Sequence, residues 1–201
     1  MSDISDSFDS FAANFDTNKP YLLHRVFVAD IQTPVSAFLK LGSGKDNCFL
    51  LESVEGGEVR GRFSVIGMSP DLIWRCRGNV AECNRDPANS DHFTAVSEAP
   101  LISLRTLLAE SEMENTGDLP PMSAGLFGYF GYDMIRHIED IPDQNDAAFD
   151  VYDSVLLRPS IVAIFDRLKD TITLVTQVRP SEWKDAQTAW DAAQSRLQSA
   201  V

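Results

Sequence analysis

Residues 154–178 read SVLLRPSIVAIFDRLKDTITLVTQV, and this stretch decides the fold. Its two arms, 154–166 and 171–178, are rich in aliphatic and β-branched residues and have the length of strands. Residues 167–170 between them, three of which are charged, are a connection of hairpin length. The stretch therefore predicts two long antiparallel strands that lie side by side.

More strands are predicted on the N-terminal side of this hairpin. Residues 21–28 and the apolar run 48–54 have strand composition, 55–58 is a turn, and 62–67 is a further strand. Residues 71–85 read as a hairpin around Gly78-Asn79. Short hairpins with segregated helices favour an α+β fold with a largely antiparallel sheet and flanking helices.

Helices are predicted where apolar residues recur at helical spacing. Thr33 and Pro34 are a good helix start, and Gly42 is a good stop. Residues 100–110 carry a leucine stripe, and 123–136 read as a strand that enters a helix. Residues 181–201, with Ser181 as the expected N-cap, place two tryptophans on one face, which packs on this sheet or on another domain.

Three segments organise the chain. Residues 1–19 are rich in Ser, Asp and Asn and are either poorly ordered or a short amphipathic helix, because their phenylalanines have helical spacing. Residues 20–180 form one domain. Residues 181–201 are expected to lead toward a further domain.

Composition excludes several classes of protein. The 201 residues carry 17 basic and 30 acidic side chains, a net charge of −13, which disfavours a nucleic-acid partner. No apolar run reaches the ~18 residues of a membrane span, and the acidic N-terminus is unlike a secretory signal. Three cysteines without a CxxC pair suit a reducing compartment, so a cytoplasmic protein is expected.

No motif for catalysis or metal binding is recognisable. The three histidines are scattered, and there is no HExxH, GxSxG or Walker lysine. Gly125, Gly128 and Gly131 recur every third residue, which does not match the GxGxxG of nucleotide-binding loops. We interpret these glycines as positions that permit close packing of aromatic neighbours.

One polar pair interrupts an apolar strand. Glu52 and Ser53 end the run 48–54, where burial would be costly without partners. A small zwitterion would suit them, since Glu52 can accept from an ammonium group and Ser53 can donate to a carboxylate. Arg62 would lie near Ser53 if the two strands pair, and could hold Glu52 or a ligand carboxylate. From the residues alone, a strand end satisfied by backbone and water is the simpler interpretation.

Several motifs occur in a fixed order between about residues 20 and 180. They are Leu50-Leu51-Glu52-Ser53-x-Glu55-Gly56-Gly57-Glu58, Gly61-Arg62-Phe63-Ser64-x-Ile66-Gly67, Gly125-Leu126-Phe127-Gly128-Tyr129-Phe130-Gly131-Tyr132-Asp133, Ala29-Asp30-x-x-Thr33-Pro34-Val35 and the hairpin after Asp71. Together they resemble the N-terminal region of anthranilate synthase component I, a family of chorismate-utilising enzymes.

The resemblance implies a function. Such subunits use Mg²⁺ to convert chorismate, with ammonia from a glutamine amidotransferase partner, into anthranilate and pyruvate, and L-tryptophan inhibits them. The serine of the LLES motif lies at the tryptophan site, so Ser53 is the first candidate, Glu52 the second and Arg62 the third. The chorismate and Mg²⁺ residues belong to a C-terminal chorismate-binding domain whose motifs do not occur here. No catalytic residue is therefore assigned, and residues 1–201 alone are expected to be inactive.

Other functions stay open at this point. Aminodeoxychorismate synthase component I, of the folate branch, shares the fold and often the tryptophan pocket. A stand-alone amino-acid-binding module is an alternative from another class. A docking domain for the amidotransferase is compatible with part of the first hypothesis.

Overall fold

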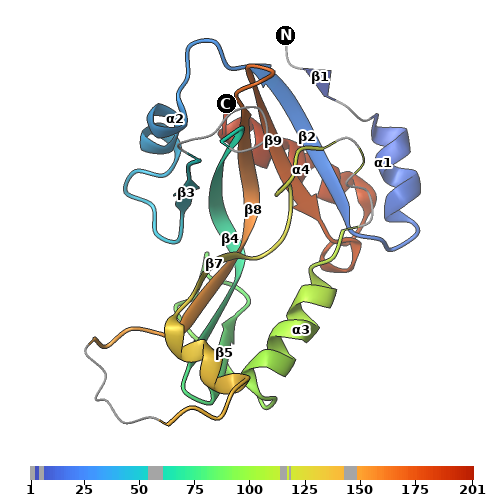
Figure 1. Ribbon diagram of the computed structural model, residues 1–201. Helices are drawn as coiled ribbons and strands as arrows, with labels where there is room; N and C mark the ends of the chain where they lie inside the picture. The colour runs from blue at the N-terminus through green and yellow to red at the C-terminus, as the bar shows by residue number, and fades with distance from the viewer. Residues whose placement is uncertain (1–2, 5–6, 54–60, 114–116, 118, 143–148) are drawn as a thin grey trace. The chain divides into compact units, whose positions relative to one another are not determined.

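A computed structural model describes residues 3–4, 7–53, 61–113, 117, 119–142 and 149–201 (Figure 1). Every strand pair with a described register is antiparallel, which confirms the α+β fold with an antiparallel sheet. The elements are β1 Asp3–Ile4, α1 Phe8–Phe15, β2 Tyr21–Val28, α2 Pro34–Leu41, β3 Phe49–Leu51, β4 Phe63–Arg77, β5 Val80–Asn84, β6 Thr94–Ala95, α3 Pro100–Glu110, β7 Phe127–Phe130, η1 Tyr132–His137, β8 Ser154–Asp166, β9 Thr171–Val178, η2 Pro180–Glu182 and α4 Ala186–Ser199.

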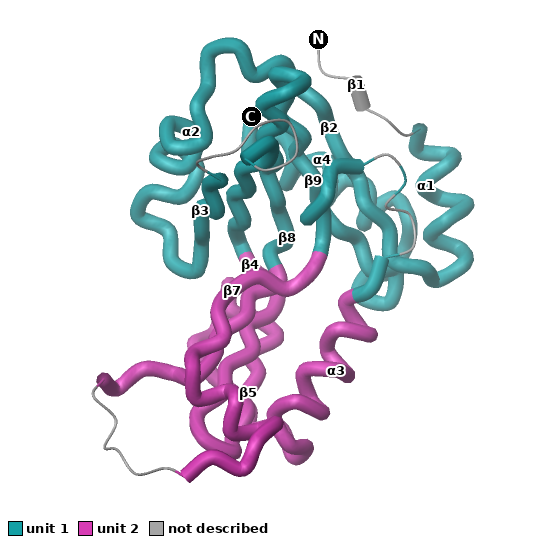
Figure 2. The backbone as a smooth tube through the Cα atoms, in the orientation of Figure 1, with its two compact units in different colours: residues 1–69, 112–124, 159–201 teal, residues 70–111, 125–158 magenta. Residues whose placement is uncertain are grey.

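The chain forms two compact units, coloured separately in Figure 2. Unit 1 comprises residues 1–69, 112–124 and 159–201, and unit 2 comprises residues 70–111 and 125–158. The long strands β4 and β8 contribute residues to both units. The division expected from the sequence, at residues 19 and 180, stays a prediction.

The predicted hairpin is the centre of unit 1. β8 and β9 pair from Ile161↔Thr176 to Asp166↔Thr171, and β2 pairs along β9 from Tyr21↔Val178 to Val28↔Thr171. β4 lies on the other side of β8, with β3 beside it. Strand alternation then sends every second residue of these strands into one common core.

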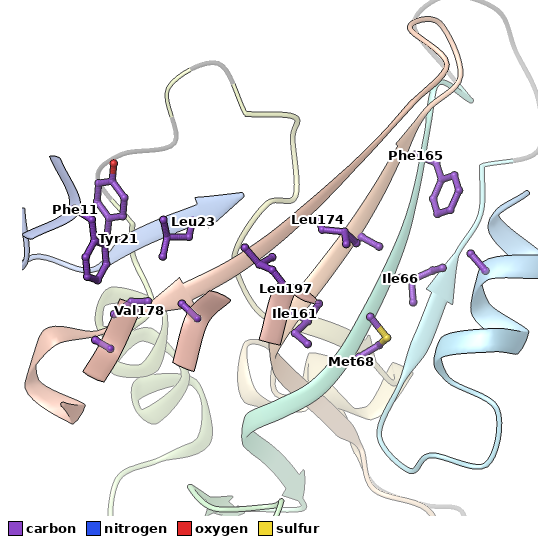
Figure 3. Packing of buried hydrophobic residues seen from close by; sticks show 14 residues of the cluster. Phe11, Tyr21, Leu23, Ile66, Met68, Ile161, Phe165, Leu174, Val178 and Leu197 are labelled. Atoms are coloured by element: carbon purple, nitrogen blue, oxygen red, sulfur yellow. The ribbon is translucent and has the colours of Figure 1, made fainter. Parts of the chain in front are cut away.

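The core of unit 1 joins three helices to the sheet. Phe11 of α1 and Leu197 of α4 are fully buried, and Ala37 of α2 packs in the same cluster. Figure 3 shows Phe11 beside Tyr21 and Leu197 near Ile161. The amphipathic N-terminal helix predicted from the phenylalanine spacing is therefore present, and aromatic contacts hold it on the unit.

The last helix begins later than predicted. Ser181 lies in the 3₁₀ turn η2, and α4 starts at Ala186, where the Asp185 carboxylate accepts from the Thr188 N–H at 2.8 Å. Aspartate is as good an N-cap as serine, so composition alone did not separate the two positions. Trp183 and Trp190 pack against the unit 1 core, so the tryptophan face lies on this unit's own sheet.

Unit 2 is built on the hairpin around Gly78-Asn79, as predicted. The stretches 62–67 and 71–77, expected as separate strands, are one strand, β4, in which Ser69 has a φ of 49°. β5 pairs with its second half, from Ile73↔Asn84 to Arg77↔Val80. Helix α3 packs on it, and the buried Trp74 Nε1 donates to Ser103 Oγ at 3.1 Å.

The glycine-rich motif forms β7 and the 3₁₀ helix η1. β7 pairs with β8, and added Cβ atoms on Gly128 and Gly131 would lie 1.9 Å from Val155 O and 2.8 Å from Asp153 O. Gly128 and Gly131 thus make room for backbone, whereas nothing lies within 4 Å of an added Cβ on Gly125. The interpretation that the glycines accommodate aromatic neighbours is wrong, because no aromatic ring is among the atoms that the added Cβ atoms would meet.

Candidate functional site

Pairing of β3 with β4 places the end of the LLES motif beside the start of β4. Phe49, Leu50 and Leu51 pair with Gly67, Ile66 and Val65. Glu52 and Ser53 follow directly after the last paired residue of β3, and Arg62 directly precedes β4. The condition under which Arg62 would return near Ser53, pairing of the two strands, is therefore met. The turn predicted at 55–58 lies outside the described residues.

β8 ends at the same place. The Arg167 N–H donates to Arg62 O at 3.0 Å, which joins the chain just after β8 to the chain just before its neighbour in the sheet, β4. Glu52 and Ser53 at the end of β3, Arg62 before β4, and Asp166 with Arg167 at the end of β8 thus converge. We call these five residues the strand-end cluster.

Arg62 has a carboxylate partner that differs from the predicted ones. Its Nε and Nη2 bind Asp166 Oδ1 and Oδ2 at 2.8 and 2.6 Å, a bidentate ion pair. Arg62 therefore holds Asp166, 4% exposed, and not Glu52. Asp166 Oδ1 also accepts from the backbone N–H groups of Leu168 and Lys169, which fixes the β8–β9 turn.

Glu52 binds the other arginine of the cluster. Its Oε1 lies 3.2 Å from Arg167 Nη2, and the two side chains are 30% and 47% exposed. Ser53 is half-buried next to Glu52. Sequence reasoning missed Asp166 and Arg167 because the order of strands in the sheet was unknown; their position in a hairpin turn was the available signal.

Arg62 holds the pKa of Asp166 below its usual value, because the charged carboxylate accepts the hydrogen bonds from Arg62 and from the turn. A folded pKa below the unfolded value of about 3.9 gives stability that is present above pH ~4 and is lost as pH falls through the folded pKa.

Asp166→Asn removes this titrating carboxylate. The urea concentration at the midpoint of unfolding should therefore fall less steeply below pH ~4 in this variant than in the wild type. Asp46→Asn, an exposed aspartate, is the control; equal acid slopes for both variants would contradict the assignment.

A cysteine and a histidine also meet, in unit 2. Cys76 Sγ lies 3.8 Å from His137 Nε2, a pairing that can activate a thiol. Burial, however, raises the pKa of Cys76 to about 11, so the thiol stays protonated near neutral pH. The pair is therefore part of the packing of unit 2.

The cavity in unit 1 lies apart from the strand-end cluster. It has a volume of about 320 Å³, lies beside α2 and is lined among others by Phe27, Lys40 and Phe165. Within the described ranges, no group of three or more acidic, cysteine or histidine side chains is placed to hold a metal ion. No helix in the same ranges is long and apolar enough to cross a membrane.

Comparison with known proteins identifies the family. No family model matches the chain. Anthranilate synthase component 1 of Cereibacter sphaeroides is 43% identical over 196 residues, 97% of this chain. That of Thermus thermophilus is 33% identical over 180 residues, 89% of this chain. The chain belongs to the anthranilate synthase component 1 family.

The chain matches a part of its relatives in this family. It spans 39% of the Cereibacter protein and 36% of the Thermus protein, the N-terminal part. The crystal structure of anthranilate synthase component I from Streptococcus pneumoniae matches 86% of this chain and 35% of its own, with a TM-score of 0.55 at 20% identity. That similarity supports the fold, which the sequence resemblance also implied.

Proposed function

We propose that residues 1–201 are the regulatory N-terminal portion of an anthranilate synthase and contribute part of an L-tryptophan feedback site at Ser53, Glu52 and Arg62. Family membership supports the enzyme class. The reaction proposed for the whole enzyme is conversion of chorismate and ammonia to anthranilate and pyruvate. Turnover is not assigned to residues 1–201 themselves.

The strand-end cluster is the observation that carries the regulatory part. Glu52 supplies a half-exposed carboxylate, and Ser53 a hydroxyl, at the convergence of three strands. Charged groups of both signs stand within one cluster, which suits a ligand that carries an ammonium and a carboxylate. The β3–β4 pairing, which runs up to Leu51 just before Glu52, and the hydrogen bond from the Arg167 N–H to Arg62 O support this arrangement.

The remaining elements of the proposal concern the whole enzyme. An amidotransferase partner would supply ammonia, and a chorismate-binding domain would hold chorismate and Mg²⁺. The described residues offer no cluster that fits Mg²⁺, so none of them is assigned to it. A cytoplasmic location is proposed because Cys48, Cys76 and Cys83 are free thiols.

The proposal predicts the effect of a bulky residue at Ser53. Ser53→Phe in the intact enzyme that carries residues 1–201 should raise the tryptophan concentration for half-inhibition about 10- to 100-fold. The reason is that overpacking a fitted site costs about 1–3 kcal/mol. Anthranilate formation is followed by fluorescence over a tryptophan series, each variant normalised to its own uninhibited rate. Chromatography of the product distinguishes anthranilate from aminodeoxychorismate.

Ser43→Phe is the matched control, because Ser43 is an exposed serine in the loop after α2 of the same unit. Its inhibition curve should match that of the wild type. An unchanged curve for Ser53→Phe would exclude Ser53 from the site. Aminodeoxychorismate as product would overturn the proposed reaction.

A further inference from the structure

The two arginines of the strand-end cluster differ in how fully their charges are engaged. Arg62 is bound through both Nε and Nη2 to Asp166, which is almost fully buried. A ligand carboxylate that approached Arg62 would meet the negative charge of Asp166 within the same ion pair. Moving Asp166 away would also remove the acceptor for two backbone N–H groups of the β8–β9 turn. Arg62 is therefore a positioning residue.

Arg167 has a fixed backbone but a guanidinium group that is only partly engaged. Its backbone is fixed by the hydrogen bond to Arg62 O, while its guanidinium makes one described side-chain contact, to Glu52 at 3.2 Å. The side chain is 47% exposed, and a guanidinium has five N–H donors. Binding a second carboxylate thus requires no change in the backbone and no loss of a buried ion pair.

We propose that Arg167 receives the carboxylate of the amino-acid effector while Glu52 receives its ammonium group. The Glu52–Arg167 pair presents one negative and one positive charge side by side, as a complement to the two charges carried by the α-carbon of an amino acid. Ligand binding replaces the 3.2 Å contact with two charge-assisted hydrogen bonds. This inference rests on the proposed effector site and assigns recognition of the ligand carboxylate to Arg167 instead of Arg62.

The assignment has a consequence for specificity. Tryptamine lacks the carboxylate, so Arg167 would stay paired with Glu52. The ammonium group of tryptamine would then have to compete with Arg167 for the Glu52 carboxylate. Indole-3-propionate lacks the ammonium group, so Glu52 would stay paired with Arg167. Its carboxylate would then have to compete with Glu52 for the Arg167 guanidinium. Both compounds are therefore expected to inhibit less than L-tryptophan, and loss of Arg167 should erase the preference over tryptamine.

The test uses Arg167→Gln in the intact enzyme that carries residues 1–201. Half-inhibition by L-tryptophan should require about tenfold more ligand or higher, the loss expected for one hydrogen bond between charged groups. Half-inhibition by tryptamine should rise by less than about twofold. Arg167→Lys, which keeps the charge, should restore most of the sensitivity to L-tryptophan.

Lys169→Gln is the matched control, because it removes a cation two residues away on the same exposed turn. Its inhibition by both compounds should equal that of the wild type. If Arg167→Gln and Lys169→Gln behave alike while the wild type is inhibited, the Arg167 assignment is overturned and the proposed function stands. If the wild type is not inhibited by L-tryptophan at all, the proposed effector function itself fails.

Discussion

Gly128→Ala is expected to lower the stability of the 201-residue chain by about 3 kcal/mol or more, at the upper end of overpacking costs. The added Cβ would lie 1.9 Å from Val155 O and 2.9 Å from Val155 C, both backbone atoms of β8. Side-chain rotation cannot relieve such a contact, so β7 must separate from β8. Urea unfolding followed by circular dichroism measures the change.

Gly44→Ala separates this clash from a general effect of losing a glycine. Gly44 has a φ of 74°, and nothing lies within 4 Å of an added Cβ. Its substitution should cost about 1–2 kcal/mol, the strain of the left-handed conformation. A loss for Gly128→Ala no greater than that for Gly44→Ala would show that β7 and β8 are not in close backbone contact.

Phe11→Ala is expected to lower the free energy of unfolding by about 3–5 kcal/mol, the usual cost of removing a buried aromatic ring. Phe11 is fully buried in α1, and its ring centroid lies 5.2 Å from that of Trp190 and 5.8 Å from that of Tyr21. One substitution therefore weakens contacts with both α4 and β2. Tryptophan fluorescence during urea unfolding reports the change close to the site.

Phe149→Ala is the control, because that ring is 78% exposed. Its unfolding free energy should stay within about 0.5 kcal/mol of the wild type. Similar small losses for both variants would mean that α1 does not contribute to the core. In that case the alternative of a poorly ordered N-terminus would be the better description.

Local elements were predictable from the sequence because their signals are local. The hairpin 154–178 showed two β-rich arms and a polar connection, and α2 showed Thr33, Pro34 and Gly42 at the right spacing. The starting residue of α4 was wrong because an equally good cap, Asp185, lies four residues after Ser181. Such choices depend on tertiary packing.

The strand-end cluster was predictable in part. Glu52 and Ser53 were singled out because polar residues followed an apolar strand, and Arg62 because the β3–β4 pairing would return it to them. The partnership of Arg62 with Asp166 was not predictable, because it depends on β8 lying next to β4. The two strands are far apart along the chain, so the sequence did not indicate that they are neighbours in the sheet. Arg167, at the end of β8, was missed for the same reason.

The pairing of β2 with β9 has a consequence for the order of events during synthesis. Tyr21 leaves the ribosome long before Val178, its partner across the sheet. At about 5–20 residues per second, β2 waits roughly 10 to 30 s for the strand that completes its hydrogen bonds. An apolar strand with an unpaired edge is prone to associate with other chains during that interval. A nascent chain arrested before β9 should therefore bind chaperones more strongly than one arrested after it.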